Sequence, residues 1–434
     1  MTLFLNSISQ EKGVDLESWE FGLRKVVLAA GANFLQEMLD GIGSGHQDAP
    51  VLCNCGCRME SRGRKKKRIK TLLGDIELWR SIFSCPNCGT VRIPADELLD
   101  VRRTGFSPGV RKLMARAGQR DTFKEGSSDL KAFAEIAVTA KDVERTAEGM
   151  GHEIEQWQHK ENTLLLQEKT EPEAQKEIPV LYVSYDGTGV PIVPWEISDR
   201  KGKQKDRKSK TREVKLGCVF TQTLRDKKGF PIRDDDSTTF IGASESSAEF
   251  GPRIYAEALR RGLKQAQKTV IIADGARYNW GIANRHFPGC IQIVDLYHAR
   301  EHLHDLCQVL KPKDKQDFNR LHTRWRTLLD EGRVDEIILY AEIMTPKKGK
   351  QKEKVEKALQ YFKNNASRMQ YADYRKQGLF VGSGVIEAGC KTVIGKRLKQ
   401  SAMQWTVRGA NDIVALRCCH LSGRMDDFMK QRAA

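Results

Sequence analysis

Apolar residues near the start of the chain recur at mixed intervals of three and four, which predicts one or two amphipathic helices over residues 16–40. From residue 178 onward the pattern changes. Continuous apolar runs at 180–185 and 291–294 predict buried β-strands, and residues 247–266 between them have the composition of a helix. Strands that alternate with helices in this way predict an α/β domain.

Three of the predicted strands are each followed by an aspartate, and these are Asp186, Asp274 and Asp295. A glycine comes after the first two, which predicts that the chain bends there. Ligand sites in open α/β sheets form beyond strand ends, and carboxylates at such a place can hold Mg²⁺. The alternative for any single one of these aspartates is a turn or a helix cap.

A third candidate acid lies near the C-terminus, where a Gly-Ser-Gly turn leads into an expected helix that carries Glu387. Two aspartates and one glutamate suit two Mg²⁺ ions, or Mn²⁺ in their place. Such a pair of ions stabilises the attacking and leaving oxygens of a phosphoryl displacement. Four basic residues follow within about three helical turns, and we expect them to contact DNA phosphates. They are Lys391, Lys396, Arg397 and Lys399.

Five cysteines lie close together, at Cys53, Cys55, Cys57, Cys85 and Cys88. The last two form a C-x2-C pair. Gly74-Asp75, between two apolar-rich segments, predicts a hairpin that brings one group of cysteines to the other. We therefore expect a zinc-ribbon-like site with four thiolate ligands. The first three form C-x-C-x-C, so one is spare, and Cys53 with either Cys55 or Cys57 is the expected set.

Residues 107–150 have the pattern of short helices, with a turn before a second helix that starts near Lys141. Thr139 and Asp142 have the spacing of a capping box. A helix-turn-helix would offer Lys141 and Arg145 to DNA, and a plain helical spacer is the alternative. Its shared core would comprise Leu130, Phe133, Val138, Val143 and Ala147.

The 434-residue chain has 73 lysines and arginines against 57 acidic residues, a net charge of +16. An excess of this size favours a polyanionic partner, usually nucleic acid, over a basic protein without one. No apolar run approaches the roughly 20 residues of a membrane helix. The first residues lack the basic start and apolar core of a signal peptide. We expect a cytoplasmic, nucleoid-associated protein with no membrane partner.

Several ordered blocks of the sequence resemble the ISKra-type insertion-sequence transposases, which are distant relatives of the Mutator-like DDE transposases. The blocks are YVSYDGTGVP, VIIADGA, IVDLYHAREHL, GSGVIEAGCKTVIGKRLKQS and WTVRGANDIVALRCC. The resemblance implies an RNase H-like catalytic core with an α-helical insertion between the second aspartate and the glutamate. It places the catalytic trio on Asp186, Asp274 and Glu387. It also implies an auxiliary role for Asp295 and His298, which form a D-x-x-H motif.

These expectations combine into an α/β protein whose RNase H-like core is preceded by a zinc-ribbon-like segment and a helix-turn-helix-like helical domain. Its partners would be double-stranded DNA, as element ends and target, and further copies of the chain. The expected segments are a helical N-terminus (1–47), the zinc-ribbon-like segment (48–103), the helix-turn-helix-like region (104–155), a linker (156–177), the first part of the core (178–305), the helical insertion (306–377) and the C-terminal part of the core (378–434).

Three other functions compete with this interpretation. One is a related nuclease that cuts DNA without rejoining it, because nicking and strand transfer use the same metal chemistry. The segment HAREH at 298–302 fits the H-x-x-E-H motif of inverted zinc peptidases. That function would leave the basic charge and the three carboxylates unexplained. A non-catalytic DNA-binding protein would use only the cysteine region and the helix-turn-helix, and it would not need the carboxylates.

Overall fold

The computed structural model describes residues 15–42, 50–168, 177–198, 210–310 and 314–433. The prediction that the first residues are not a signal peptide falls mostly outside this part of the chain. The chain separates into two compact units, residues 1–147 and residues 148–434, and each is described by itself.

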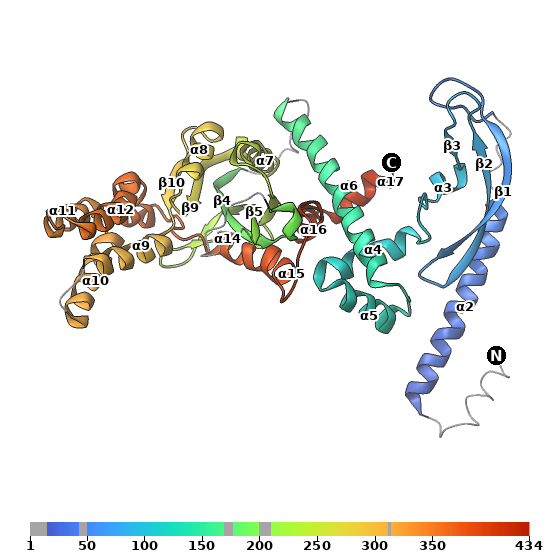
Figure 1. The fold of residues 1–434 in the computed structure, drawn as a ribbon, viewed down its shortest axis with the longest axis horizontal. Helices are drawn as coiled ribbons and strands as arrows, with labels where there is room; N and C mark the ends of the chain where they lie inside the picture. Colours follow the sequence, from blue (N-terminus) through green and yellow to red (C-terminus); the bar gives the residue numbers. More distant parts are fainter. Residues whose placement is uncertain (1–14, 43–49, 169–176, 199–209, 311–313, 434) are drawn as a thin grey trace. The chain divides into compact units, whose positions relative to one another are not determined.

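The first unit contains a long helix, a small antiparallel sheet and a group of helices (Figure 1). Its elements are α2 (Leu16–Ile42), β1 (Glu60–Lys70), β2 (Asp75–Ser84), β3 (Val91–Arg92), α3 (Pro94–Leu98), α4 (Pro108–Arg120), α5 (Phe123–Ala134) and the start of α6 (Ala140–Leu166). The strand order is β1-β2-β3. The hairpin predicted at Gly74 is confirmed: this glycine has a φ of 141°, and β1 and β2 pair on either side of it.

Helix α2 packs one face against the small sheet. Leu39 of α2 lies in a core cluster with Ile69 of β1 and with Ile76 and Leu78 of β2. In β2 the buried residues alternate at Ile76 and Leu78 and then, after a shift of one residue near the register irregularity in β1, at Ser81 and Phe83.

Helices α4, α5 and α6 share a second core, which contains Leu130 and Val143 together with Val110 and Met114 of α4. The capping box at the start of α6 is confirmed, because Thr139 and Asp142 each accept a hydrogen bond from the other's backbone N–H. The prediction for Phe133 is wrong, since its side chain is 75% exposed. The core of this unit instead includes Val110 and Met114 of α4.

Residues 156–177, expected to be partly helical and to end in a linker, begin with the last part of α6, which continues without a break to Leu166. Ile154 and Trp157 are buried, and the ring of Trp157 lies 5.6 Å from that of Phe428. These apolar contacts explain why α6 remains helical through a segment of mostly polar residues. Residues 169–176 lie outside the described residues, and the finer division into segments stays a prediction.

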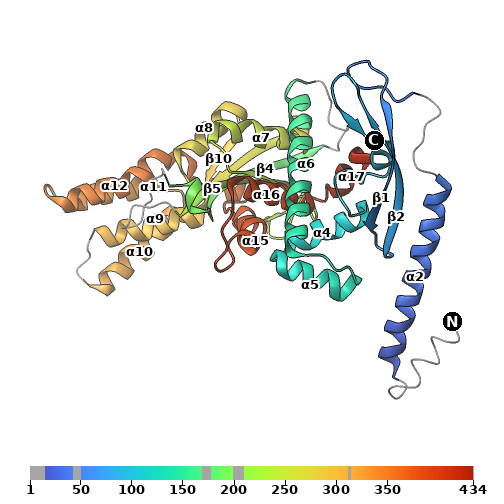
Figure 2. The same ribbon diagram turned by 45° about the vertical axis from the view of Figure 1, so that its right-hand side comes forward.

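The second unit is built on a mixed five-stranded sheet with helices around it (Figure 2). Its strands and adjoining 3-10 helices are β4 (Ile178–Pro191), η1 (Pro194–Glu196), β5 (Thr211–Gln222), β6 (Leu224–Arg225), β7 (Pro231–Ile232), β8 (Thr239–Ala243), η2 (Leu263–Gln265), β9 (Ala266–Ala273) and β10 (Ile291–Val294). The sheet order is β10-β9-β4-β5-β8. Strands β10, β9 and β4 run parallel, whereas β5 is antiparallel to both β4 and β8.

Helices cover both faces of this sheet. They are α7 (Ser247–Arg260), α8 (Arg277–His286), α9 (Leu296–Val309), α14 (Gly384–Gly389), the π-helix η4 (Cys390–Gly395), α15 (Lys396–Leu398), α16 (Val407–Leu421) and α17 (Met425–Ala433). A Cβ atom on Gly217 of β5 would meet Ile254 of α7, whereas one on Gly389 of α14 would meet Leu216 of β5. Consecutive residues of β5 therefore face α7 and α14 in turn.

The strand predicted to end at Asp186 continues to Pro191. Its parallel pairing with β9 ends at Ser184, but its antiparallel pairing with β5 extends through Asp186 as far as Pro191. The bend expected at Gly187 is therefore wrong. A Cβ atom at Gly187 would come within 2.1 Å of the Glu213 carboxylate, so this glycine provides a close approach within the sheet.

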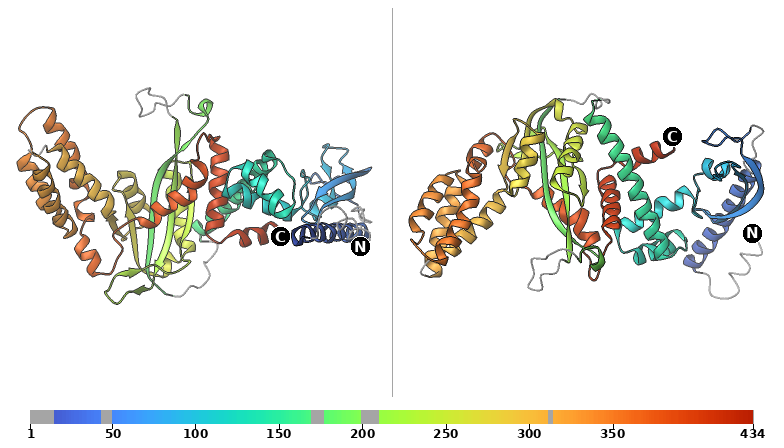
Figure 3. Two further views of the ribbon diagram at one scale, coloured as in Figure 1. Left: turned by 90° about the horizontal axis from the view of Figure 1, so that it is seen from below. Right: turned by 45° about the horizontal axis from the view of Figure 1, so that its top comes forward.

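The expected helical insertion is helical apart from short connections in its described part (Figure 3). Its elements after α9 are α10 (Lys315–Asp330), α11 (Val334–Met344), α12 (Lys350–Asn365), η3 (Ala366–Arg368) and α13 (Tyr371–Lys376). The hydroxyl of buried Tyr371 donates to the carbonyl of Val294, which ties the insertion to the end of β10.

Tyr182 of β4 connects the sheet to the segment that leads into α14. Its fully buried hydroxyl donates to Oε1 of Gln222 at 2.6 Å and accepts from the N–H of Phe380 at 3.2 Å. Its ring stacks on Phe220. This side chain therefore holds the chain before Glu387 against the sheet.

We predict that Tyr182→Phe lowers the free energy of unfolding by about 1–3 kcal/mol, because two buried polar groups lose their partner. Urea unfolding followed by circular dichroism measures this change. Tyr297→Phe is the matched control, since Tyr297 is 59% exposed. Equal stability of the two variants would contradict the assigned role of the Tyr182 hydroxyl.

Candidate active site

Strand register places Asp186 beside Asp274. The last residue pair between parallel strands β4 and β9 is Ser184 with Ile272, so the two aspartates occupy the same row two residues further on. Neighbouring strands are about 4.8 Å apart, which brings the two carboxylates to one edge of the sheet. Leu216 pairs with Asp186 and packs toward α14, so Asp186 points to the same face as that helix.

The carboxylate of Asp186 is partly buried in negative surroundings. Burial is the largest cause that raises its pKa, and the charge of Asp274 raises it further. The N–H of Gly187, which donates to Oδ1 at 2.7 Å, and the imidazole of His298 act in the opposite direction. The net direction of the pKa is upward. Within the described residues Asp186, Asp274 and Glu387 form no ion pair with a lysine or arginine, so a bound cation would relieve this repulsion.

Asp274 is held in place by its own turn and by the insertion. Its Oδ1 accepts from the N–H of Ala276 at 2.9 Å and from Nδ2 of Asn279 at 2.7 Å. Tyr361 of α12 donates its hydroxyl to the Asp274 carbonyl, and Asn365 of α12 donates to the carbonyl of Gly275. Gly275 has a φ of 94°, which allows the sharp turn after β9.

Asp295 is the N-cap of α9 and is completely buried. Its Oδ1 accepts from the N–H of His298 at 2.7 Å, and its Oδ2 accepts from the N–H of Ser383. One carboxylate thus joins the start of α9 to the turn before α14. The predicted D-x-x-H motif corresponds to this cap, which explains the spacing of three residues.

Glu387 lies in the short helix α14, four residues after Ser383, whose hydroxyl is 3.4 Å from Oε1 of Glu387. Asp295, His298 and Glu387 offer ligand atoms that all lie within 4.8 Å of one another. The π-helix η4 follows directly, and its first residue, Cys390, has its sulfur 3.9 Å from Oδ2 of Asp186. The start of α9, which follows β10, and the short helices α14 and η4 therefore meet at the acidic edge of the sheet.

The two histidines of the HAREH segment have different surroundings. His298 belongs to the group with Asp295 and Glu387, whereas the ring of His302 stacks on Tyr361 with centroids 3.7 Å apart. Glu301 is exposed and lies 3.5 Å from His298. Among the described residues, no metal-binding group contains both histidines, so the geometry does not favour a zinc peptidase.

Three of the four basic residues predicted after Glu387 are exposed, namely Lys391, Lys396 and Lys399. Lys399 also donates to the hydroxyl of Thr188, two residues after Asp186. Arg397 has no exposed surface, and its guanidinium lies 4.8 Å from the ring centroid of Trp405. The prediction that Arg397 contacts DNA is therefore wrong, because this side chain supports the fold. Lys141 and Arg145 are exposed at the start of α6 in the first unit.

Sequence patterns did not identify several residues of this site. Glu213 lies on β5, and its charge acts on Asp186. It has no motif of its own, and only the strand register reveals its position. Tyr361 likewise acts through a hydrogen bond from a distant segment, for which the local sequence contains no signal. Ser383 belongs to the predicted Gly-Ser-Gly turn and lies four residues before Glu387, but its backbone bond to Asp295 joins distant segments.

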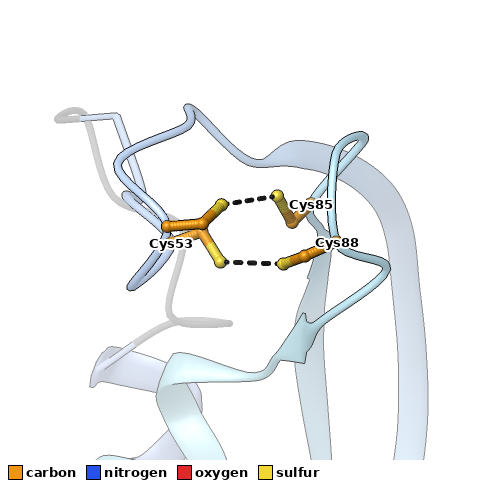
Figure 4. A group of neighbouring side chains, drawn as sticks. Cys53, Cys85 and Cys88 are labelled. Carbon is orange, nitrogen blue, oxygen red and sulfur yellow. Dashed lines mark hydrogen bonds between the residues drawn. The ribbon is translucent and has the colours of Figure 1, made fainter.

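The cysteine region forms a separate candidate metal centre in the first unit. The sulfur atoms of Cys53, Cys55, Cys85 and Cys88 lie within 4.8 Å of one another, with 3.4 Å between Cys53 and Cys88 and 3.5 Å between Cys55 and Cys85. Figure 4 shows the thiols turned toward one another from two loops. Sulfur ligands at about 2.3 Å from one zinc ion would be about 3.8 Å apart, so the cluster can bind a metal of this kind.

Cys57 is outside this group of four, so the geometry favours Cys55 over Cys57 as the fourth ligand. The backbone N–H of Cys57 instead lowers the pKa of Cys55, which favours a thiolate there. Gly56 and Gly89 have φ values of 83° and 70° and allow the two cysteine turns.

The chain has limited similarity to known proteins. No family model matches the chain. A UPF0236 protein of Caldanaerobacter subterraneus subsp. tengcongensis is 22% identical over 369 residues, which cover 83% of this chain and 68% of that protein. Its name joins eleven locus designations. The chain therefore has weak homology to UPF0236 proteins.

Among solved structures, the Drosophila P element transposase strand transfer complex aligns with 75% of this chain and 81% of that one, at 8% identity and a TM-score of 0.25. A similarity this low carries no argument about fold or function. The specific resemblance to ISKra-type transposases stays a prediction. None of the described helices is long and apolar enough to cross a membrane.

We predict that Cys55→Ser removes bound zinc from the purified protein, whereas Cys57→Ser retains it, because only Cys55 belongs to the group of four sulfurs. Elemental analysis by mass spectrometry measures zinc per chain. Zinc loss in Cys57→Ser with retention in Cys55→Ser would reverse the assignment.

Proposed function

We propose that this protein is a DDE-type DNA transposase whose catalytic residues are Asp186, Asp274 and Glu387. The observation that supports the proposal most is the strand register, which runs toward Asp186 and Asp274 at one edge of the sheet. Glu387 lies in a group with Asp295 and His298, and Cys390, three residues after Glu387, contacts Asp186. Among the residues that the structure describes, none of the three proposed catalytic carboxylates pairs with a lysine or arginine, and together with the net charge of +16 this fits metal-dependent chemistry on a polyanion.

The proposed catalytic core is RNase H-like. Strands β4, β5 and β8 form an antiparallel meander, and β9 and β10 then add in parallel on the other side of β4. This order and these directions are those expected of such a core, and the long helical insertion between Asp274 and Glu387 agrees with the sequence resemblance.

Asp186, Asp274 and Glu387 are the proposed Mg²⁺ ligands because their oxygens are the hard donors this ion prefers. Both oxygens of Asp295 already accept backbone N–H groups, so we assign it a positioning role. When bound, two such ions supply charge stabilisation to the attacking and leaving oxygens of the phosphoryl group.

The remaining residues position the DNA. Lys399 lies beside Thr188 at the same edge and can neutralise a phosphate next to the scissile bond. Lys391 and Lys396 continue the exposed basic surface. In the first unit, Lys141 and Arg145 would contact phosphates of the element ends, alongside the cysteine region with its proposed structural zinc.

The proposed reaction has two steps of the same kind. Water first attacks a phosphorus atom at the element end, and the 3′-oxygen leaves. The freed 3′-hydroxyl then attacks a phosphorus atom of the target DNA, and the 3′-oxygen of the target strand leaves. Both ends must be held together, so we propose that the protein acts as a homo-oligomer. A homologue whose name joins eleven loci of one genome fits the behaviour of a mobile element.

We predict that the native protein cleaves labelled DNA bearing the element ends in the presence of Mg²⁺, and that Glu387→Gln slows cleavage by roughly 100-fold or more, because a metal ligand is lost. Glu301→Gln is the matched control, since Glu301 is exposed and outside the trio. It should cleave at nearly the native rate.

Other outcomes separate the alternatives. Equal cleavage by the native protein and Glu387→Gln would remove Glu387 from the site. Loss of activity only in Glu301→Gln, with peptide cleavage by the native protein, would support the zinc peptidase instead. DNA binding without cleavage by any variant would support a non-catalytic DNA-binding protein.

DNA affinity should fall steeply with salt, since phosphate contacts dominate such binding. The variant Lys391→Ala/Lys396→Ala should bind more weakly and have a shallower slope of log affinity against log salt, by about 1–2. Arg397→Lys should leave that slope unchanged because Arg397 is buried. Fluorescence anisotropy at several salt concentrations measures the slopes, and an affinity independent of salt would contradict the proposed interface.

A further inference from the structure

Helix α2 has an exposed apolar stripe on the side away from the small sheet of the first unit. The stripe recurs at intervals of three, four and four residues along the helix, and six of its seven members are large side chains. Its members, here called the outer stripe, are Leu16, Trp19, Leu23, Val27, Ala30, Phe34 and Met38.

The large residues of the outer stripe are between 48% and 73% exposed. With about 3.6 residues per turn, all seven fall on roughly one third of the helix circumference. The opposite face contains Leu35 and Leu39, which pack against the core of the small sheet. Helix α2 is therefore apolar on two opposite faces, and the sheet uses only one of them.

A solvent-exposed surface helix normally has a polar outer face. The six large residues of the outer stripe together expose roughly 700 Å² of apolar surface, more than the few hundred Å² of a typical exposed patch on a monomer. Burial of this surface is consequently expected to drive an association.

We propose that the outer stripe is a dimerisation surface, and that its partner is α2 of a second copy of this chain. Two copies of the stripe would bury roughly 1,400 Å² in total, which lies within the range of stable protein interfaces. The helix is about 40 Å long, enough for an extended contact. The stripe contains no charged residue, so an identical apolar stripe is a complementary partner through a two-fold axis.

The spacing of the stripe supports a helix pair in particular. Leu16, Val27 and Met38 are eleven residues apart, and a repeat of eleven residues in three turns is close to the natural period of a helix. Two such helices can stay in contact along their whole length with very little supercoiling. Two copies of α2 can therefore form a continuous apolar contact although the helix has no heptad repeat.

This inference rests on the surface of α2 and would hold if the proposed DNA chemistry failed. The outer stripe is the surface through which the expected homo-oligomer would associate. The experiment therefore measures the mass of the protein in solution in the absence of DNA.

Sedimentation equilibrium of the full chain should give twice the chain mass of 49.1 kDa for the native protein. Phe34→Glu should shift the dissociation constant upward by at least about 100-fold, because a charge would be buried in the apolar seam. Phe21→Glu is the matched control on the same helix. Phe21 is 47% exposed but lies outside the outer stripe, so this variant should remain dimeric.

Two further variants separate association from folding. Phe34→Leu should remain dimeric, and Val27→Glu should dissociate, with circular dichroism and zinc content unchanged in both. A monomeric native protein at tens of micromolar would overturn the proposal. A dimer that Phe34→Glu and Val27→Glu leave intact would overturn it as well. If the native protein is a dimer, Phe34→Glu and Val27→Glu dissociate it, and no DNA is cleaved, only the proposed function is rejected.

Discussion

The parallel pairing of β4 with β9 in a single register is the constraint on which the candidate site depends. Because Ser184 pairs with Ile272, the same register continues toward Asp186 and Asp274 two positions further on, and the charge of Asp274 acts on Asp186. A shift of one residue would move one carboxylate to the opposite face of the sheet. Mutual repulsion between these acids opposes the arrangement, and the buried strands on either side hold it in place.

Elements far away in the sequence complete the arrangement. Asp295 uses one carboxylate to fix both the start of α9 and the turn before α14, so the helices carrying His298 and Glu387 are held relative to each other. The insertion contributes Tyr361, which bonds to the backbone of Asp274. A long helical insertion at this place therefore supports the acidic edge from the side. Backbone hydrogen bonds, rather than side-chain ion pairs, provide most of this support.

The first unit is stabilised by different interactions from those of the second. Its small sheet has a limited core, and four thiols from two loops meet at one end of the hairpin. A metal at that point would stabilise a segment that apolar packing alone holds weakly. The long helix α2 adds one apolar face to the sheet and leaves the other exposed, so this unit combines a self-contained fold with a surface suited to association.

The sequence by itself determined the local features. Strands, the hairpin at Gly74, the cap at Thr139 and the candidate acids follow from periodicity, turn residues and spacing, which act over a few neighbouring positions. Only the tertiary structure decided that Cys55 rather than Cys57 joins the cysteine cluster, that Arg397 is buried and that Phe133 is exposed. It also decided that α6 continues through a polar segment. These outcomes depend on contacts between distant residues, and a single sequence contains no local signal for such contacts.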